Sequence, residues 1–81
     1  MMNKLHILKK LDVEACRSDF RARNFKQAYH DVTGELISED EVILCALHKA
    51  RLMQSRFFSK EEKDLSKKWL SDHQYQIPKE R

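Results

Sequence analysis

Glycine and proline each occur only once among the 81 residues of this chain, as Gly34 and Pro78. A β-sheet built from hairpins needs several tight bends, and those bends depend on glycine and on similar turn-forming residues. A chain this poor in such residues therefore favours helices. Its length suits one domain, whose core is too small to give a large stability margin.

The pattern of apolar residues agrees with helices and argues against disorder. Charged residues make up 36% of the chain, a proportion that is also found in disordered proteins. However, 41% of the residues are hydrophobic, and they recur at the spacing of a helix. The sequence therefore predicts an all-α fold, a small compact bundle of four to five short helices. We expect a single helical domain over residues 1–77 and a charged C-terminal tail over residues 78–81.

In the first half of the chain, the apolar stripe changes direction. Val13, Cys16 and Phe20 share one face at about 100° per residue, whereas the apolar residues after position 24 share another. A break near Asn24 resolves this conflict, with Asn24 as the N-cap of the next helix and Gly34 as its end. The predicted helices of this half cover about 4–11, 13–23 and 25–33.

The second half carries two capping boxes, in which a serine is followed three residues later by a glutamate. Ser38 with Glu41 predicts the start of a central helix, and Ser59 with Glu62 predicts the start of the last one. Acidic side chains crowd the start of the central helix, where the helix dipole favours them. The predicted helices of this half cover about 39–57 and 60–73.

The central helix has apolar residues on two opposite sides. Its main stripe, which we expect to face the core, consists of Ile43, Ala46, Leu47, Ala50, Met53 and Phe57. Cys45 and Leu52 lie about 180° from that stripe. Two interpretations stay open. Either neighbouring helices pack on both sides of this helix, or the side with Cys45 and Leu52 is an exposed seam for a partner or a second copy of the chain.

Candidate catalytic and metal-binding residues are sparse. Cys45 and His48 are placed on one side of a helix, but a closed zinc site needs a second pair of ligands, and Cys16 and the other three histidines are isolated. The sequence has no glycine-rich phosphate loop. A core of this size also leaves little room for a catalytic cleft. We therefore expect no metal, no cofactor and no enzymatic activity.

Cysteine usage and hydropathy bear on the cellular setting. Two cysteines are fewer than a small secreted domain usually carries, although a single bridge between Cys16 and Cys45 stays an alternative to two free thiols. No segment resembles a signal peptide, and none approaches the roughly 18 apolar residues of a membrane span. We expect a cytoplasmic protein that does not contact a membrane.

The net charge of +3 is unevenly distributed along the chain. Residues 34–47 carry a net charge of −4, whereas residues 48–81 carry +4. Lysines at helical spacing on the last helix could neutralise phosphates, although acidic residues interrupt the row and +3 is low for a nucleic-acid-binding protein. The candidate residues for nucleic-acid binding, the alternative function, are Arg56, Lys60, Lys63, Lys67 and Lys68.

The function that we expect first is that of a small regulator or adaptor that binds another macromolecule, in particular a protein. An exposed Leu52, between Lys49 and Arg56, would be an apolar spot ringed by basic groups, which is the anatomy of a modest interface and favours an acidic partner. The candidate partner-binding residues are Cys45, His48, Lys49, Leu52 and Arg56. A homodimer through the same side is an alternative. By analogy of size and charge, such a protein could modulate transcription or a host process in bacteria or phages.

Overall fold

A computed structural model describes residues 8, 9, 11, 22–37 and 40–80 of the chain. Its helices are α2 (Ala22–Leu36), α3 (Glu41–Met53) and α4 (Lys60–Asp72), with a 3₁₀ turn, η2 (Ser55–Phe57), between α3 and α4. These ranges contain no strand, so the all-α class is confirmed for the described part of the chain. Three helices are seen there, fewer than the expected four to five. Apart from positions 8, 9 and 11, which are helical, the predicted helix 4–11 and most of 13–23 lie outside the described residues.

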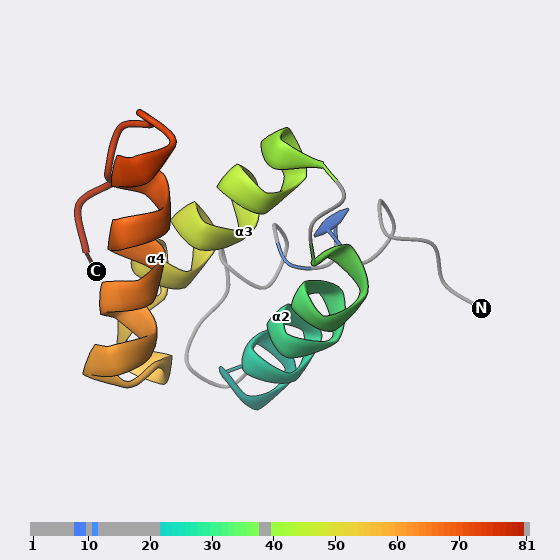
Figure 1. Cartoon of the computed structure of the whole chain (residues 1–81). Coiled ribbons are helices and arrows are strands. Elements are labelled where there is room, and N and C mark those ends of the chain that lie inside the picture. The colour runs from blue at the N-terminus through green and yellow to red at the C-terminus, as the bar shows by residue number, and fades with distance from the viewer. Residues whose placement is uncertain (1–7, 10, 12–21, 38–39, 81) are drawn as a thin grey trace.

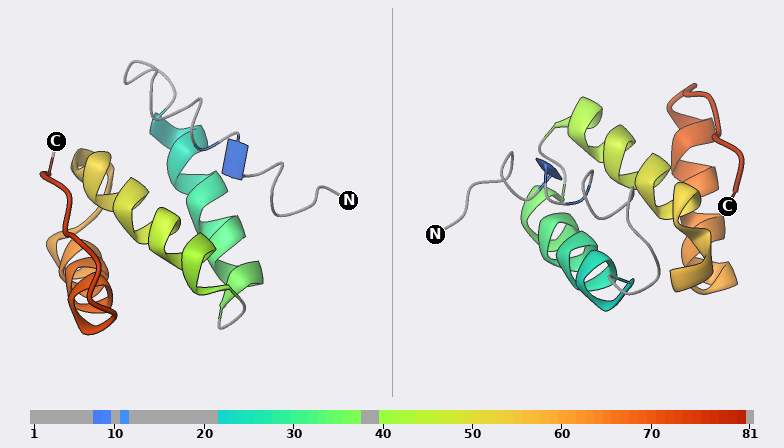
Figure 2. Two further views of the ribbon diagram at one scale, coloured as in Figure 1. Left: turned by 90° about the horizontal axis from the view of Figure 1, so that it is seen from above. Right: turned by 180° about the vertical axis from the view of Figure 1, so that it is seen from behind.

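The helix α3 lies between the other two (Figure 1), and the views from above and from behind show the same order (Figure 2). One apolar cluster fills the α2 side of α3. Its buried members are Leu11, Phe25, Ala28, Tyr29, Val32, Leu36, Leu47 and Phe58. A smaller cluster fills the α4 side. Its buried members are Cys45, Leu52 and Leu70. Of the two interpretations of the central helix, packing on both sides is therefore the one that the structure supports.

The expected exposed seam at Cys45 and Leu52 is wrong. Leu52 is 0% exposed and Cys45 is buried, because α4 covers this side of α3 with Leu70. The same arrangement exposes part of the stripe that was expected to face the core. Ala46 is exposed and Met53 is 38% exposed, since a helix that is covered from two opposite sides leaves the direction between them open to solvent.

The helix α2 runs without a break through Asn24 and Gly34, where the sequence predicts a start and an end. Its buried stripe consists of Phe25, Ala28, Tyr29, Val32 and Leu36. Leu36 lies beyond Gly34, and its burial extends the helix past the glycine. Burying a leucine contributes about 1.5–3 kcal/mol, which exceeds the cost of about 1 kcal/mol for a glycine inside a helix.

Both ends of α3 differ from the prediction. Asp40 is the N-cap, and its Oδ1 accepts hydrogen bonds from the backbone N–H groups of Val42 (2.9 Å) and Ile43 (3.4 Å). The predicted cap, Ser38, lies outside the described residues. At the other end the α-helix stops at Met53, and η2 replaces its expected last turn. The expected helix 39–57 is therefore shorter.

The start of α4 confirms the second capping box. The N–H of Glu62 donates to Ser59 Oγ (3.1 Å), and the N–H of Ser59 donates to Glu62 Oε1 (2.9 Å). The buried line of this helix consists of Ser66 and Leu70, while Leu65 is 63% exposed.

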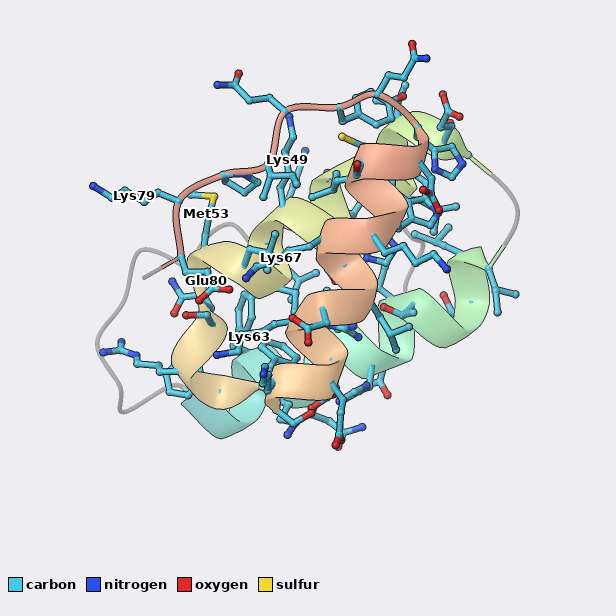
Figure 3. The ribbon with its side chains drawn as sticks, turned by 60° about the vertical axis from the view of Figure 1, so that its left-hand side comes forward. Lys49, Met53, Lys63, Lys67, Lys79 and Glu80 are labelled. Atoms are coloured by element: carbon cyan, nitrogen blue, oxygen red, sulfur yellow. The ribbon has the colours of Figure 1, made fainter. Side chains whose placement is uncertain are left out.

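The end of α4 is a Schellman motif that reverses the chain. The N–H of Tyr75 donates to the carbonyl of Leu70 (2.9 Å), and the N–H of Gln74 donates to that of Ser71 (3.0 Å). Gln74 has the left-handed φ of 63° that this motif requires. The chain then returns along α3 and α4 (Figure 3). Within the described ranges, no helix combines the length and the apolar character needed to cross a membrane.

Candidate functional site

Four lysines and a methionine gather where α3, α4 and the returning tail meet (Figure 3). We call this surface the lysine face. It consists of Lys49, Met53, Lys63, Lys67 and Lys79. Its geometry follows from helical spacing, because α3 and α4 each contribute two residues that are one turn apart on the same side. The Schellman motif then places the tail, with Lys79, beside them.

A carboxylate from the chain itself already rests on the lysine face. Glu80 Oε1 lies 2.6 Å from Lys67 Nζ. The hydrogen bond between them raises the pKa of Lys67 and lowers the pKa of Glu80. Both side chains are substantially exposed, so the pair contributes little to the stability of the fold. It does show that the surface accommodates a carboxylate.

Tyr75 anchors the tail at the edge of this face. Its hydroxyl donates a hydrogen bond to Glu41 Oε2 (2.8 Å), and this bond raises the pKa of Tyr75. Lys49 Nζ lies 6.0 Å from the centre of the Tyr75 ring, at the outer limit of a cation–π contact. The tail therefore contacts the helices at Tyr75 and again at Glu80.

The residues predicted for a protein partner do not form one surface. Lys49 belongs to the lysine face, whereas Cys45 and Leu52 are buried between α3 and α4. His48 lines a groove described below, and the exposed Arg56 lies in η2, with its guanidinium 4.8 Å from the Phe57 ring centre. An apolar centre among basic groups is nevertheless present. Met53 forms it, one residue after the predicted Leu52.

The residues predicted for nucleic-acid binding are also divided. Lys60, Lys63 and Lys67 follow one side of α4 at helical spacing. Lys68 is exposed, but it lies about 100° further round the helix. Sequence reasoning missed Met53, Lys79 and Glu80 as parts of this surface. The sequence pattern placed Met53 in the apolar stripe that was expected to face the core. For Lys79 and Glu80, nothing local in the sequence shows that the tail folds back.

A second surface, which sequence reasoning also missed, is a half-open groove of about 600 Å³. The end of α2, α3 and the second half of α4 form it. Its lining residues are Thr33, Ile37, Glu41, Leu44, His48, Trp69 and His73. On α4, Trp69 and Lys67 lie on opposite sides of the buried line, so the groove and the lysine face are separate surfaces.

Stacked rings form one side of the groove. The indole of Trp69 stacks on the ring of His73 (centroids 3.9 Å apart) and on that of His48 (4.7 Å). A hydrogen bond of 2.9 Å joins His48 Nδ1 to Ser66 Oγ. Burial, together with the Arg51 guanidinium, lowers the pKa of His48 to about 4, so this ring is uncharged at neutral pH. Ser66 is fully buried, which keeps its hydroxyl away from any substrate.

Arg51 is a structural residue that the sequence pattern did not reveal. It is buried, and its guanidinium lies over the rings of Tyr29 (4.6 Å) and Phe58 (5.3 Å). Its Nη1 donates to the backbone carbonyl of Glu62 (2.8 Å). Arg51 therefore connects α3 with α2 and with the first turn of α4. Its partners are distant in the sequence, so no local pattern could have identified them.

Metal-ligating residues do not gather in the described part of the chain, where no three His, Cys, Asp or Glu side chains could share an ion. Cys45 is a free, buried thiol, and Cys16 lies outside the described residues. Comparisons with protein-family models, with curated proteins and with solved structures find no match to this chain.

Proposed function

We propose that this chain is a small non-enzymatic adaptor or regulator that binds an acidic protein partner through the lysine face. The observation that carries the proposal is the contact between Glu80 and Lys67, in which a carboxylate docks on this surface. An acidic side chain of a partner would make the same contact. The free Cys45 thiol agrees with a reducing, cytoplasmic setting, which is part of the proposal.

The composition of the lysine face supports a protein partner. Met53 is an exposed apolar side chain with basic groups around it, and interfaces commonly combine an apolar centre with a polar rim. Methionine also adapts its shape to different partners, because its side chain is unbranched and flexible. The lysines would attract an acidic partner and increase the rate of its association.

Nucleic-acid binding is the second candidate, and the row of Lys60, Lys63 and Lys67 along α4 favours it. The composition of the face favours a protein instead, because none of the five residues that define the lysine face is aromatic, so the face itself offers no ring on which a base could stack. The total charge of +3 is also modest for a nucleic-acid-binding protein.

The test uses a fluorescein-labelled amphipathic peptide of Glu and Leu, whose dissociation constant is measured by fluorescence anisotropy. Lys67→Glu and Lys68→Glu are matched variants, since each reverses one charge at adjacent positions of α4. We expect Lys67→Glu to weaken binding by roughly five- to tenfold, and Lys68→Glu by less than about twofold. Met53→Ala should also weaken binding. Equal effects of the two lysine variants would refute the proposal.

A single-stranded oligonucleotide serves as the second probe and separates the two candidate functions. Phosphate neutralisation releases counterions, so the affinity for nucleic acid falls steeply as salt rises. We expect the oligonucleotide to bind more weakly than the acidic peptide at physiological salt. Tighter oligonucleotide binding that Lys67→Glu abolishes would instead support nucleic-acid binding.

A further inference from the structure

The groove between α2, α3 and α4 plays no part in the proposed function, yet it has the features of a second binding site. We propose that it binds an amphipathic helix of a protein partner that presents leucine-like side chains together with Lys or Arg. This inference is independent of the lysine face. It stands on the apolar lining of the groove, on its charge, and on exposed apolar side chains at its edges.

Apolar side chains are exposed on two sides of the groove. Ile37, just beyond the end of α2, lines the groove and is 71% exposed. On the other side, Trp69 lines the groove and Leu65, one turn earlier on α4, is 63% exposed. Leu44 from α3 lies between them. An amphipathic helix matches such a surface, because it presents apolar residues at intervals of three and four positions.

The charge of the groove determines the kind of helix. Among the described residues that line the groove, Glu41 is the one carboxylate, and none is a lysine or an arginine. The Glu41 carboxylate is 58% exposed, and the Tyr75 hydroxyl (2.8 Å) and His73 Nε2 (3.8 Å) hold it in place. His48 does not offset this charge, because burial keeps its ring neutral.

Asp40, which precedes Glu41 in the sequence, strengthens this preference because it is exposed and acidic. A cationic partner segment would therefore be attracted to the groove, and an acidic one would be repelled. A volume of about 600 Å³ lies within the range of established binding pockets. It can receive a few side chains from one face of a helix, while the rest of that helix stays outside.

Trp69 is the only tryptophan of the chain, so its fluorescence reports directly on the groove. The probe is an amphipathic peptide of Leu and Lys that lacks aromatic residues. We expect it to change the Trp69 emission in a saturable way, whereas the peptide of Glu and Leu should not. Glu41→Gln, which removes the charge and keeps the shape, should weaken the binding of the Leu and Lys peptide by about fivefold.

Two further variants complete the test. Ile37→Ala should weaken binding of the Leu and Lys peptide without loss of folding, because this side chain is largely exposed in the free protein. Lys67→Glu should leave it unchanged, which separates the groove from the lysine face. Wild-type affinity in both Glu41→Gln and Ile37→Ala, or no change of Trp69 emission, would overturn the inference. Either result would leave the proposal for the lysine face untouched.

Discussion

Replacing Leu52 or its neighbour Met53 by alanine should change the free energy of unfolding by very different amounts. Leu52 is 0% exposed and packs in the cluster between α3 and α4, whereas Met53 is 38% exposed. Truncating a fully buried leucine removes its transfer free energy and leaves a cavity, which together cost about 3–5 kcal/mol. Truncating Met53 should cost about 1 kcal/mol or less, because much of its side chain already contacts water.

The difference is large in relation to the stability of the whole domain. At roughly 0.05–0.15 kcal/mol per residue, a chain of this length has a free energy of unfolding of about 4–12 kcal/mol. Leu52→Ala should therefore remove a quarter of it or more. Urea denaturation followed by far-UV circular dichroism measures both variants. The melting temperature gives a second readout, with an expected fall of at least about 12 °C for Leu52→Ala.

Two results would show that Leu52 and Met53 are placed differently. If Met53→Ala were as damaging as Leu52→Ala, Met53 would be buried and the lysine face would lack its exposed apolar centre. If Leu52→Ala cost less than about 1 kcal/mol, Leu52 would be exposed, and the seam expected from the sequence would again be a candidate interface. Either result would require a different orientation of α3.

Three further predictions concern local features. Gly34→Ala should stabilise the protein by about 1 kcal/mol, since Gly34 is inside a helix and the added Cβ would meet nothing within 4 Å; an unchanged or lower melting temperature would count against it. Gln74→Gly should stabilise the protein by about 1 kcal/mol and so raise the urea midpoint, because a non-glycine residue with φ of 63° is strained. A lower midpoint would show that Gln74 is not strained. His48 should make the folded protein less stable as the pH falls from about 6.5 towards 4, because its ring binds a proton at a higher pH in the unfolded chain than in the folded protein. The stabilising contribution of the neutral His48 ring is therefore complete only above about pH 6.5. His48→Gln should therefore lose less stability than the parent between pH 7 and pH 5 in urea titrations, and an equal loss would argue against the lowered pKa.

The last helix was predictable because its signals are local. The capping box of Ser59 and Glu62 needs only four consecutive residues, and it defines the start of α4 correctly. Lys63 and Lys67 share a side of that helix through spacing alone. The part of the lysine face that comes from α4 could therefore be derived from the sequence.

The other parts depend on contacts between distant segments. Whether Leu52 or Met53 is exposed depends on which helices cover α3, and the pattern of one helix does not contain that information. Lys79 and Glu80 join the lysine face because the chain reverses at Gln74, a residue whose type does not indicate a left-handed conformation. Gly34 likewise suggested that α2 ends there. The helix continues to Leu36 because that side chain is buried against distant residues, which the local sequence does not show.

Chemical-shift mapping is the sharpest test of whether an acidic partner binds at the lysine face. Uniformly ¹⁵N-labelled protein is titrated with the amphipathic peptide of Glu and Leu, and the backbone amide shifts are followed residue by residue. We predict the largest shifts at Lys49, Met53, Lys63 and Lys67, together with a shift at Glu80 as the peptide displaces its carboxylate from Lys67. Shifts centred on Ile37, Glu41 and Trp69 instead, or the absence of any saturable shift, would show that the lysine face does not bind an acidic partner.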